Sequence, residues 1–158
     1  MQLLLLHDFH RAHGANFAEV NGSEVPADYG DWLAEYEGLR KNAGIADLSC
    51  RSRLCLTGTD RIRFLHGQVT NNVQALGTGR GCYAALVNAK GRLEADLNAY
   101  ALADELLLDS EPGLTGSLVQ RLERYIVADD VQVVDVSSLY GLLTVQGPSA
   151  AVRRQGDA

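Results

Sequence analysis

The stretch 81–100, GCYAALVNAKGRLEADLNAY, decides the fold because it holds two strand patterns on either side of one glycine turn. Residues 81–88 and 92–103 each favour a strand, and Gly91 can supply the positive φ that a tight connection needs. We therefore expect an antiparallel hairpin. Side chains alternate along its second strand, so one face is predicted to carry Leu93, Ala95, Leu97 and Ala99.

The opposite face of the same strand is predicted to be a polar row. Its members are Arg92, Glu94, Asp96, Asn98 and Tyr100. An ionised carboxylate only accepts hydrogen bonds, so a row of this kind suits a ligand rich in N–H donors. Antiparallel sheets also commonly keep one polar face in water. From the residues alone, a solvated surface is the more common case and a binding site is the alternative.

The segments around the hairpin extend the sheet. A strand at 53–58 precedes a helix at 59–73, a strand at 106–109 precedes a helix that opens at Pro112, and the final strands are expected at 130–136 and 140–147. The order predicts an α+β fold, with a ferredoxin-like split β-α-β antiparallel sheet and extra strands. We place this domain at 51–147.

The first fifty residues predict a separate unit. It would hold a short helix at 8–15, a hairpin at 17–26 that turns at Asn21-Gly22, and a helix at 29–44 that ends at Gly44. Residues 148–158 begin like a new helix at Pro148 and then stop, so we expect them to be the start of a further segment. The chain looks like part of a longer protein.

Composition narrows the classes of function. The formal net charge is −6, the isoelectric point is near 5.1, and no stripe of Lys or Arg is present, which argues against nucleic acid as a partner. The apolar run Leu3–Leu6 is too short to span a membrane and lacks the features of a signal peptide, so we expect a cytoplasmic protein and no membrane partner.

Several chemical motifs are weak. The chain has three cysteines without CxxC spacing: Cys50, Cys55 and Cys82. This number and spacing predict that they are reduced residues in or near the core. The glycines of 77–81 precede a strand and not a helix, which argues against a phosphate loop. Histidines recur at positions 7, 10 and 13, but this spacing differs from that of zinc helices. We predict no metal site and no hydrolase triad.

Five short motifs together resemble a known family. Residues 88–100, with DFHRAHGA (8–15), GIADLS (44–49), TGTDRIRFLHGQVTNNV (57–73) and LLTVQGPSAA (142–151), resemble the amino-terminal half of the superfamily of glycine-cleavage aminomethyltransferases (T-proteins) and YgfZ proteins. Members resemble a three-lobed cloverleaf with folate in a central channel. The resemblance implies that residues 1–50 are an incomplete first lobe, and that the later chain completing it is absent here.

The resemblance also implies a site. T-proteins carry a pair of acids in this strand, and the second, at Asp96 here, is the catalytic group beside tetrahydrofolate. We therefore predict Asp96 as a catalytic and folate-binding residue, with Asn98, Tyr100 and Tyr83 as further folate-binding residues. The first acid is replaced by Ala95, and the stretch 106–113 lacks the asparagine that helps T-proteins hold folate. Both departures favour the YgfZ side.

The sequence thus favours a folate-binding protein of YgfZ type, which assists the assembly or repair of iron–sulfur proteins. One alternative is a tetrahydrofolate-dependent aminomethyltransferase, and another is a non-catalytic truncated module. The expected partners are folate and either iron–sulfur client proteins or a lipoyl carrier protein. Because lobes of the family pack on one another, we also expect this chain to expose apolar surface and to self-associate.

Overall fold

The computed structural model describes residues 3–151. The chain divides into two compact units, one formed by residues 1–50 and 141–158 and the other by residues 51–140. We call them the first unit and the second unit. Both contain antiparallel strand pairs and helices, so the protein is of mixed α/β class with antiparallel sheets. No helix between residues 3 and 151 is long and apolar enough to cross a membrane.

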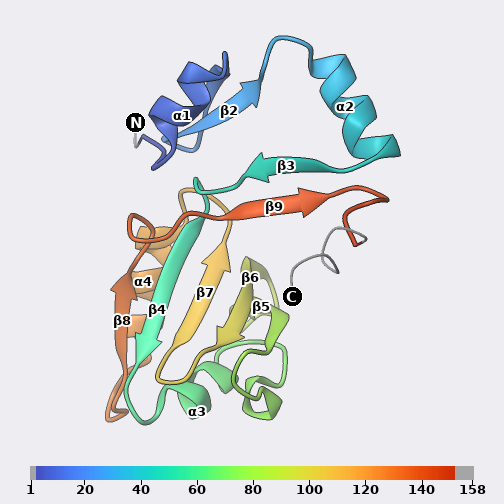
Figure 1. The fold of residues 1–158 in the computed structure, drawn as a ribbon. Helices are drawn as coiled ribbons and strands as arrows, with labels where there is room; N and C mark the ends of the chain where they lie inside the picture. Colours follow the sequence, from blue (N-terminus) through green and yellow to red (C-terminus); the bar gives the residue numbers. More distant parts are fainter. Residues whose placement is uncertain (1–2, 152–158) are drawn as a thin grey trace. The chain divides into compact units, whose positions relative to one another are not determined.

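A five-stranded antiparallel sheet forms the second unit, with the strand order β5-β6-β7-β4-β8. Figure 1 shows the five strands side by side, with α4 next to the end that holds β8 and β4. The strands are β4 (Ser52–Thr57), β5 (Gly81–Val87), β6 (Leu93–Ala101), β7 (Leu106–Ser110) and β8 (Gln132–Asp135). Long apolar runs in β4 and β7 place these strands in the middle of the sheet, where they are most buried.

The helices of this unit cover one face of the sheet. Helix α3 (Arg61–His66) contributes Phe64 and Leu65 to the core, and α4 (Thr115–Glu123) contributes Leu118 and Leu122. They pack on apolar side chains of every second strand position. These side chains are Leu54, Leu56, Ala84, Leu86, Ala95, Leu97, Ala99, Ala101, Leu106 and Leu108. The other face of the sheet is left without a helix of this unit.

The predicted hairpin is confirmed, with one irregularity. Gly91 has a φ of +73°, and β5 and β6 pair over their whole length. A bulge shifts the register between Leu86 and Val87, so that Leu86 pairs with Ala95 but Val87 pairs with Leu93. Leu93, predicted on the apolar face, is 64% exposed because it lies beyond the bulge.

The helix predicted at 59–73 is shorter than expected. It ends at His66, and only a 3₁₀ turn, η1 (Val73–Ala75), follows. Between them the chain runs along the edge of β5, where Val69 forms a bridge with Leu86 and the amide of Thr70 donates to the Ala85 carbonyl. Satisfying the polar groups of an edge strand therefore outweighs the helical pattern of this stretch.

The predicted elements of the first unit are largely confirmed. They are α1 (His7–Ala12), β1 (Asn16–Val20), β2 (Ser23–Asp28) and α2 (Trp32–Lys41). Asn21 and Gly22 both have positive φ, as a two-residue hairpin turn requires. Helix α2 stops at Lys41, three residues earlier than expected, because Gly44 is already the first residue of a strand, β3 (Gly44–Asp47).

Strand β9 (Leu143–Gln146) pairs with β3 and not with the five-stranded sheet. Residues 141–151 therefore group with the first unit and the second unit ends at Tyr140, whereas the predicted domain extends to residue 147. Residues 148–151 form a turn where a helix was expected, and the rest of that segment, 152–158, lies outside the described residues.

Candidate functional site

The face of the five-stranded sheet opposite α3 and α4 carries a row of polar residues on four strands, and the two inner members, Arg53 and Asp109, are buried. Cross-strand partners share a face, and the register pairs Tyr83 with Asn98, Asn98 with Asp109, and Asp109 with Arg53. Asp96 lies two residues from Asn98 on β6 and therefore on the same face, opposite Ala85. The hairpin thus presents Asp96 and Asn98 beside the polar side chains of β5 and β7.

A short hydrogen bond joins two of the predicted site residues. The Tyr83 hydroxyl donates to Oδ2 of Asp96 at 2.6 Å, and Tyr83 is itself 61% exposed. The hydrogen bond to Asp96, loss of solvation, and the negative charges of Asp96 and Glu111 raise the pKa of Tyr83. Tyr83 therefore remains a donor at neutral pH. The other Asp96 oxygen, Oδ1, has no hydrogen bond to residues 3–151 and can accept one from a ligand.

An ion network that sequence reasoning missed lies on the neighbouring strand. Arg51 donates from Nε to both oxygens of Asp109, at 2.9 and 3.0 Å, and from Nη1 to Glu111 at 2.5 Å. Burial lowers the pKa of Arg51, but the hydrogen bonds and charges of Glu111 and Asp109 hold it above its ordinary value. Arg51 precedes Asp109 by 58 residues, so only the β4–β7 register reveals this pair.

Some residues of the predicted polar row lie together on this sheet face, and others lie elsewhere. Asn98 is half-buried beside Tyr83, and Tyr100, 42% exposed, lies further along the same strand. Glu94 is not part of this face, because the bulge turns it toward α4, where Arg121 binds its carboxylate at 2.9 Å. Arg92 precedes β6 and lies outside the strand. The polar row of β6 therefore begins at Asp96.

The histidines of the first unit are held by hydrogen bonds. His7 contacts Glu24 at 2.7 Å, His13 donates from Nδ1 to the Phe9 carbonyl at 2.8 Å, and buried His10 lies between Asp47 and Tyr29. All three histidines are therefore engaged in hydrogen bonds within the first unit. No group of three His, Cys, Asp or Glu side chains that could hold a metal ion is found among residues 3–151.

The cysteines lie in or near the core, as predicted: Cys55 is buried, and Cys50 and Cys82 are half-buried. Cys55 is buried on β4, and its thiol donates to Glu105 at 2.8 Å. Burial, followed by the hydrogen bond and charge of Glu105, raises the pKa of Cys55 to about 12. The thiol therefore stays protonated at neutral pH and is a poor nucleophile or metal ligand.

The sequence profile described as "GCVT N-terminal domain" matches residues 6–153. The chain belongs to this family. Two curated relatives are both called aminomethyltransferase: the protein of Mycobacterium avium is 33% identical over 92% of this chain, and that of Nitrosococcus oceani is 31% identical over 96%. The chain spans about 40% of the length of these two relatives.

A solved structure has the same fold as this GCVT N-terminal domain. The glycine cleavage system aminomethyltransferase T from Bartonella henselae is similar with a TM-score of 0.81 and 26% identity, over 96% of this chain and 42% of that one. The resemblance found in the sequence motifs is thus confirmed at the level of the family. The names of the relatives favour the aminomethyltransferase alternative over the YgfZ-type interpretation that the motifs placed first.

Proposed function

We propose that this GCVT N-terminal domain provides the tetrahydrofolate site of an aminomethyltransferase, with Asp96 as the catalytic carboxylate. The observation that carries the proposal is the position of half-buried Asp96 on the sheet face opposite α3 and α4, with Oδ2 held by exposed Tyr83 and Oδ1 available. Membership of a family whose curated relatives are called aminomethyltransferase supports the reaction class.

The chemistry of the row suits a pterin. A pterin ring presents amide and amine N–H donors, which a carboxylate can accept, and hydrogen bonds to charged groups contribute about 1.5 to 3 kcal/mol each. Tyr83 fixes the orientation of the Asp96 carboxylate, while Asn98 and exposed Tyr100 provide an amide and a ring surface. Asp96 would orient N5 of tetrahydrofolate for attack on the methylene of a lipoyl carrier protein and favour loss of the N5 proton.

Asp96→Asn tests the role of the carboxylate. The substitution keeps the shape but replaces one acceptor oxygen with a donor that would face donors of the ligand, so tetrahydrofolate affinity should fall about ten- to a hundredfold. Calorimetry on the longest natural form of the protein containing this chain would measure the affinity. The free energy of unfolding should change little, because Asp96 is only half-buried.

Asp104→Asn is the matched control, because it makes the same Asp-to-Asn change in the exposed turn between β6 and β7. Its affinity for tetrahydrofolate should equal that of the unmodified protein. Tyr83→Phe should weaken binding less than Asp96→Asn does, since it removes only the group that orients the carboxylate. If Asp96→Asn and Asp104→Asn bind equally well, the site is not at Asp96.

A YgfZ-type role in iron–sulfur protein assembly or repair is the second candidate. The observation in its favour is that β7 places Asp109 opposite Asn98. The stretch 106–113, to which Asp109 belongs, lacks the asparagine that helps T-proteins hold folate. The replacement of the first acid by Ala95 is weaker support, because Ala95 is buried on the helix-covered face, away from Asp96. Aminomethyl transfer from a lipoyl carrier protein, assayed in the longest natural form, would distinguish the two candidates.

The split β-α-β interpretation of the sheet belongs to the same proposal. With β5 set aside, the strand order β8-β4-β7-β6 and the helices α3 and α4 support a ferredoxin-like arrangement extended by one edge strand. In that arrangement Asp96 and Asn98 lie on the sheet face opposite α3 and α4.

A further inference from the structure

A pocket lies on the helix-covered side of the sheet, away from Asp96. It has a volume of about 310 Å³ and is formed by α4 and by the bulged end of the β5–β6 hairpin. Ala95 lines it, and the next residue, Asp96, points to the opposite face of β6. The volume falls at the small end of the range of ligand pockets, about 300 to 1,000 Å³.

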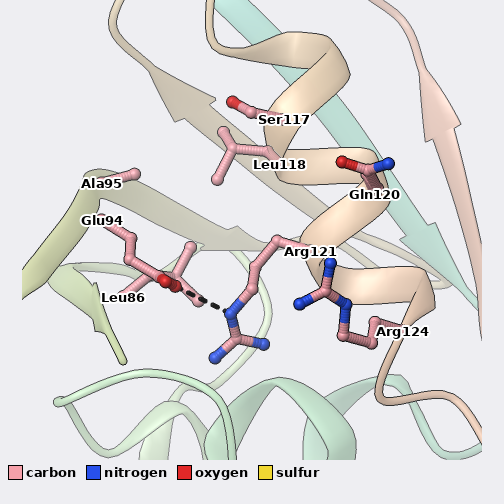
Figure 2. A pocket seen from close by; sticks show the side chains of 8 residues that line it. All are labelled: Leu86, Glu94, Ala95, Ser117, Leu118, Gln120, Arg121 and Arg124. Atoms are coloured by element: carbon pink, nitrogen blue, oxygen red, sulfur yellow. Dashed lines mark hydrogen bonds and ion pairs between the residues drawn. The ribbon is translucent and has the colours of Figure 1, made fainter. Parts of the chain in front are cut away.

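Arg121 is held rigidly at one wall of this pocket. Its Nε donates to Glu94 at 2.9 Å and its Nη1 donates to the side-chain carbonyl of Gln68 at 3.0 Å. The guanidinium carbon lies 4.1 Å from the centre of the Tyr125 ring. Figure 2 shows the Arg121 side chain reaching from α4 to Glu94, with the rest of the guanidinium directed away from the helix. Its orientation is therefore set before any ligand arrives.

Arg124 adds a charge that is not neutralised. It follows Arg121 by three residues, so it lies beside it at the end of α4 (Figure 2), and it forms no ion pair with residues 3–151. The pocket therefore holds two guanidinium groups and one carboxylate, Glu94, which leaves one net positive charge.

The remaining walls combine apolar contact with neutral polar groups. Leu86, Ala95 and Leu118 are buried core residues that form the apolar part of the lining. Gln120 adds an amide on the exposed side of α4, where Figure 2 shows it on the same stretch of helix as Arg124. The pocket thus combines apolar lining residues with a pair of guanidinium groups.

We propose that this pocket binds a small organic monocarboxylate with a short apolar body. A carboxylate matches the planar donors of a guanidinium, and its single charge matches the single uncompensated charge of the pocket. A doubly charged phosphate would meet Glu94 without a second free cation. The apolar body would lie on Ala95 and Leu118, which keep a small accessible surface in the pocket lining. This site does not depend on the folate proposal, because it lies on the other face of β6.

Ligand-observed saturation-transfer NMR with isovalerate and the 158-residue chain tests the proposal. Saturable binding of isovalerate is expected, and isopentyl alcohol, which has the same body without charge, should bind at least about tenfold more weakly. Arg124→Gln should weaken isovalerate binding about tenfold, and Gln120→Glu, which adds a carboxylate at an exposed position, should do the same.

Arg11→Gln is the control, because Arg11 is an exposed arginine of the first unit that pairs only with Asp8 among the residues described. It lowers the net charge by the same amount as Arg124→Gln and should leave binding unchanged. The proposal is overturned if isovalerate shows no saturable binding. It is equally overturned if isopentyl alcohol binds as well, or if Arg124→Gln, Gln120→Glu and Arg11→Gln all bind isovalerate with the same affinity.

Discussion

Gly58→Ala should destabilise the second unit by about 3 to 4 kcal/mol. Gly58 has a φ of +99°, and an L residue in such a conformation costs about 1 to 2 kcal/mol. A Cβ at this position would also lie inside the contact distance of the Asp130 carbonyl oxygen and 2.7 Å from the carbonyl carbon. Since these are backbone atoms, the loop that contains Asp130 would have to move.

That movement would break hydrogen bonds that join two loops. The Asp130 carboxylate accepts from the amide and hydroxyl of Thr59 at 2.9 and 2.8 Å, and the Asp130 amide donates to Asp60 at 3.0 Å. Losing two such bonds costs about 1 kcal/mol each, which gives a total of about 3 to 4 kcal/mol when added to the conformational cost of about 1 to 2 kcal/mol. For a unit of this size the unfolding midpoint would fall by roughly 12 to 32 °C.

Gly91→Ala separates the conformational cost of a positive φ from the cost of the contact with Asp130. Gly91 also has a positive φ, +73°, but no atom lies within 4 Å of a Cβ at that position. Its cost should therefore be the conformational part alone, about 1 to 2 kcal/mol. Urea unfolding followed by far-ultraviolet circular dichroism would measure both variants. Equal losses of stability within about 0.5 kcal/mol would show that the contact with Asp130 is not what requires a glycine at 58.

Two further predictions concern reactivity and surface. Cys55 should react with iodoacetamide at pH 8 at least about tenfold more slowly than an ordinary thiol, because burial and the contact with Glu105 raise its pKa to about 12, so that little thiolate is present. Equal labelling of Cys55 and Cys50 by mass spectrometry would contradict this. The first unit exposes large apolar side chains such as Trp32 and Ile45, so the chain should self-associate or bind a hydrophobic dye. Light scattering of a monomer without dye binding would argue against that expectation.

The sequence by itself determined the local structure of this protein. Turn glycines and alternating side chains predicted the hairpins at Asn21-Gly22 and Gly91, because these signals act within a few residues and depend on backbone sterics. Asp96 was found by its place in a motif, and strand alternation placed its side chain on the other face of the strand from that of Ala95. Five motifs in order were also sufficient to identify the family, which the match over residues 6–153 confirms.

Only the tertiary structure decided which of these local elements meet. Strand β9 pairs with β3, almost a hundred residues away, and Arg51 pairs with Asp109 across two strands, and neither pairing has a signal in the nearby sequence. The bulge that turns Glu94 toward Arg121 likewise depends on the register of β5 against β6. Side chains change face with every residue, so a one-residue shift in pairing moves a carboxylate from one site to another, and pairing is fixed by packing of the whole sheet.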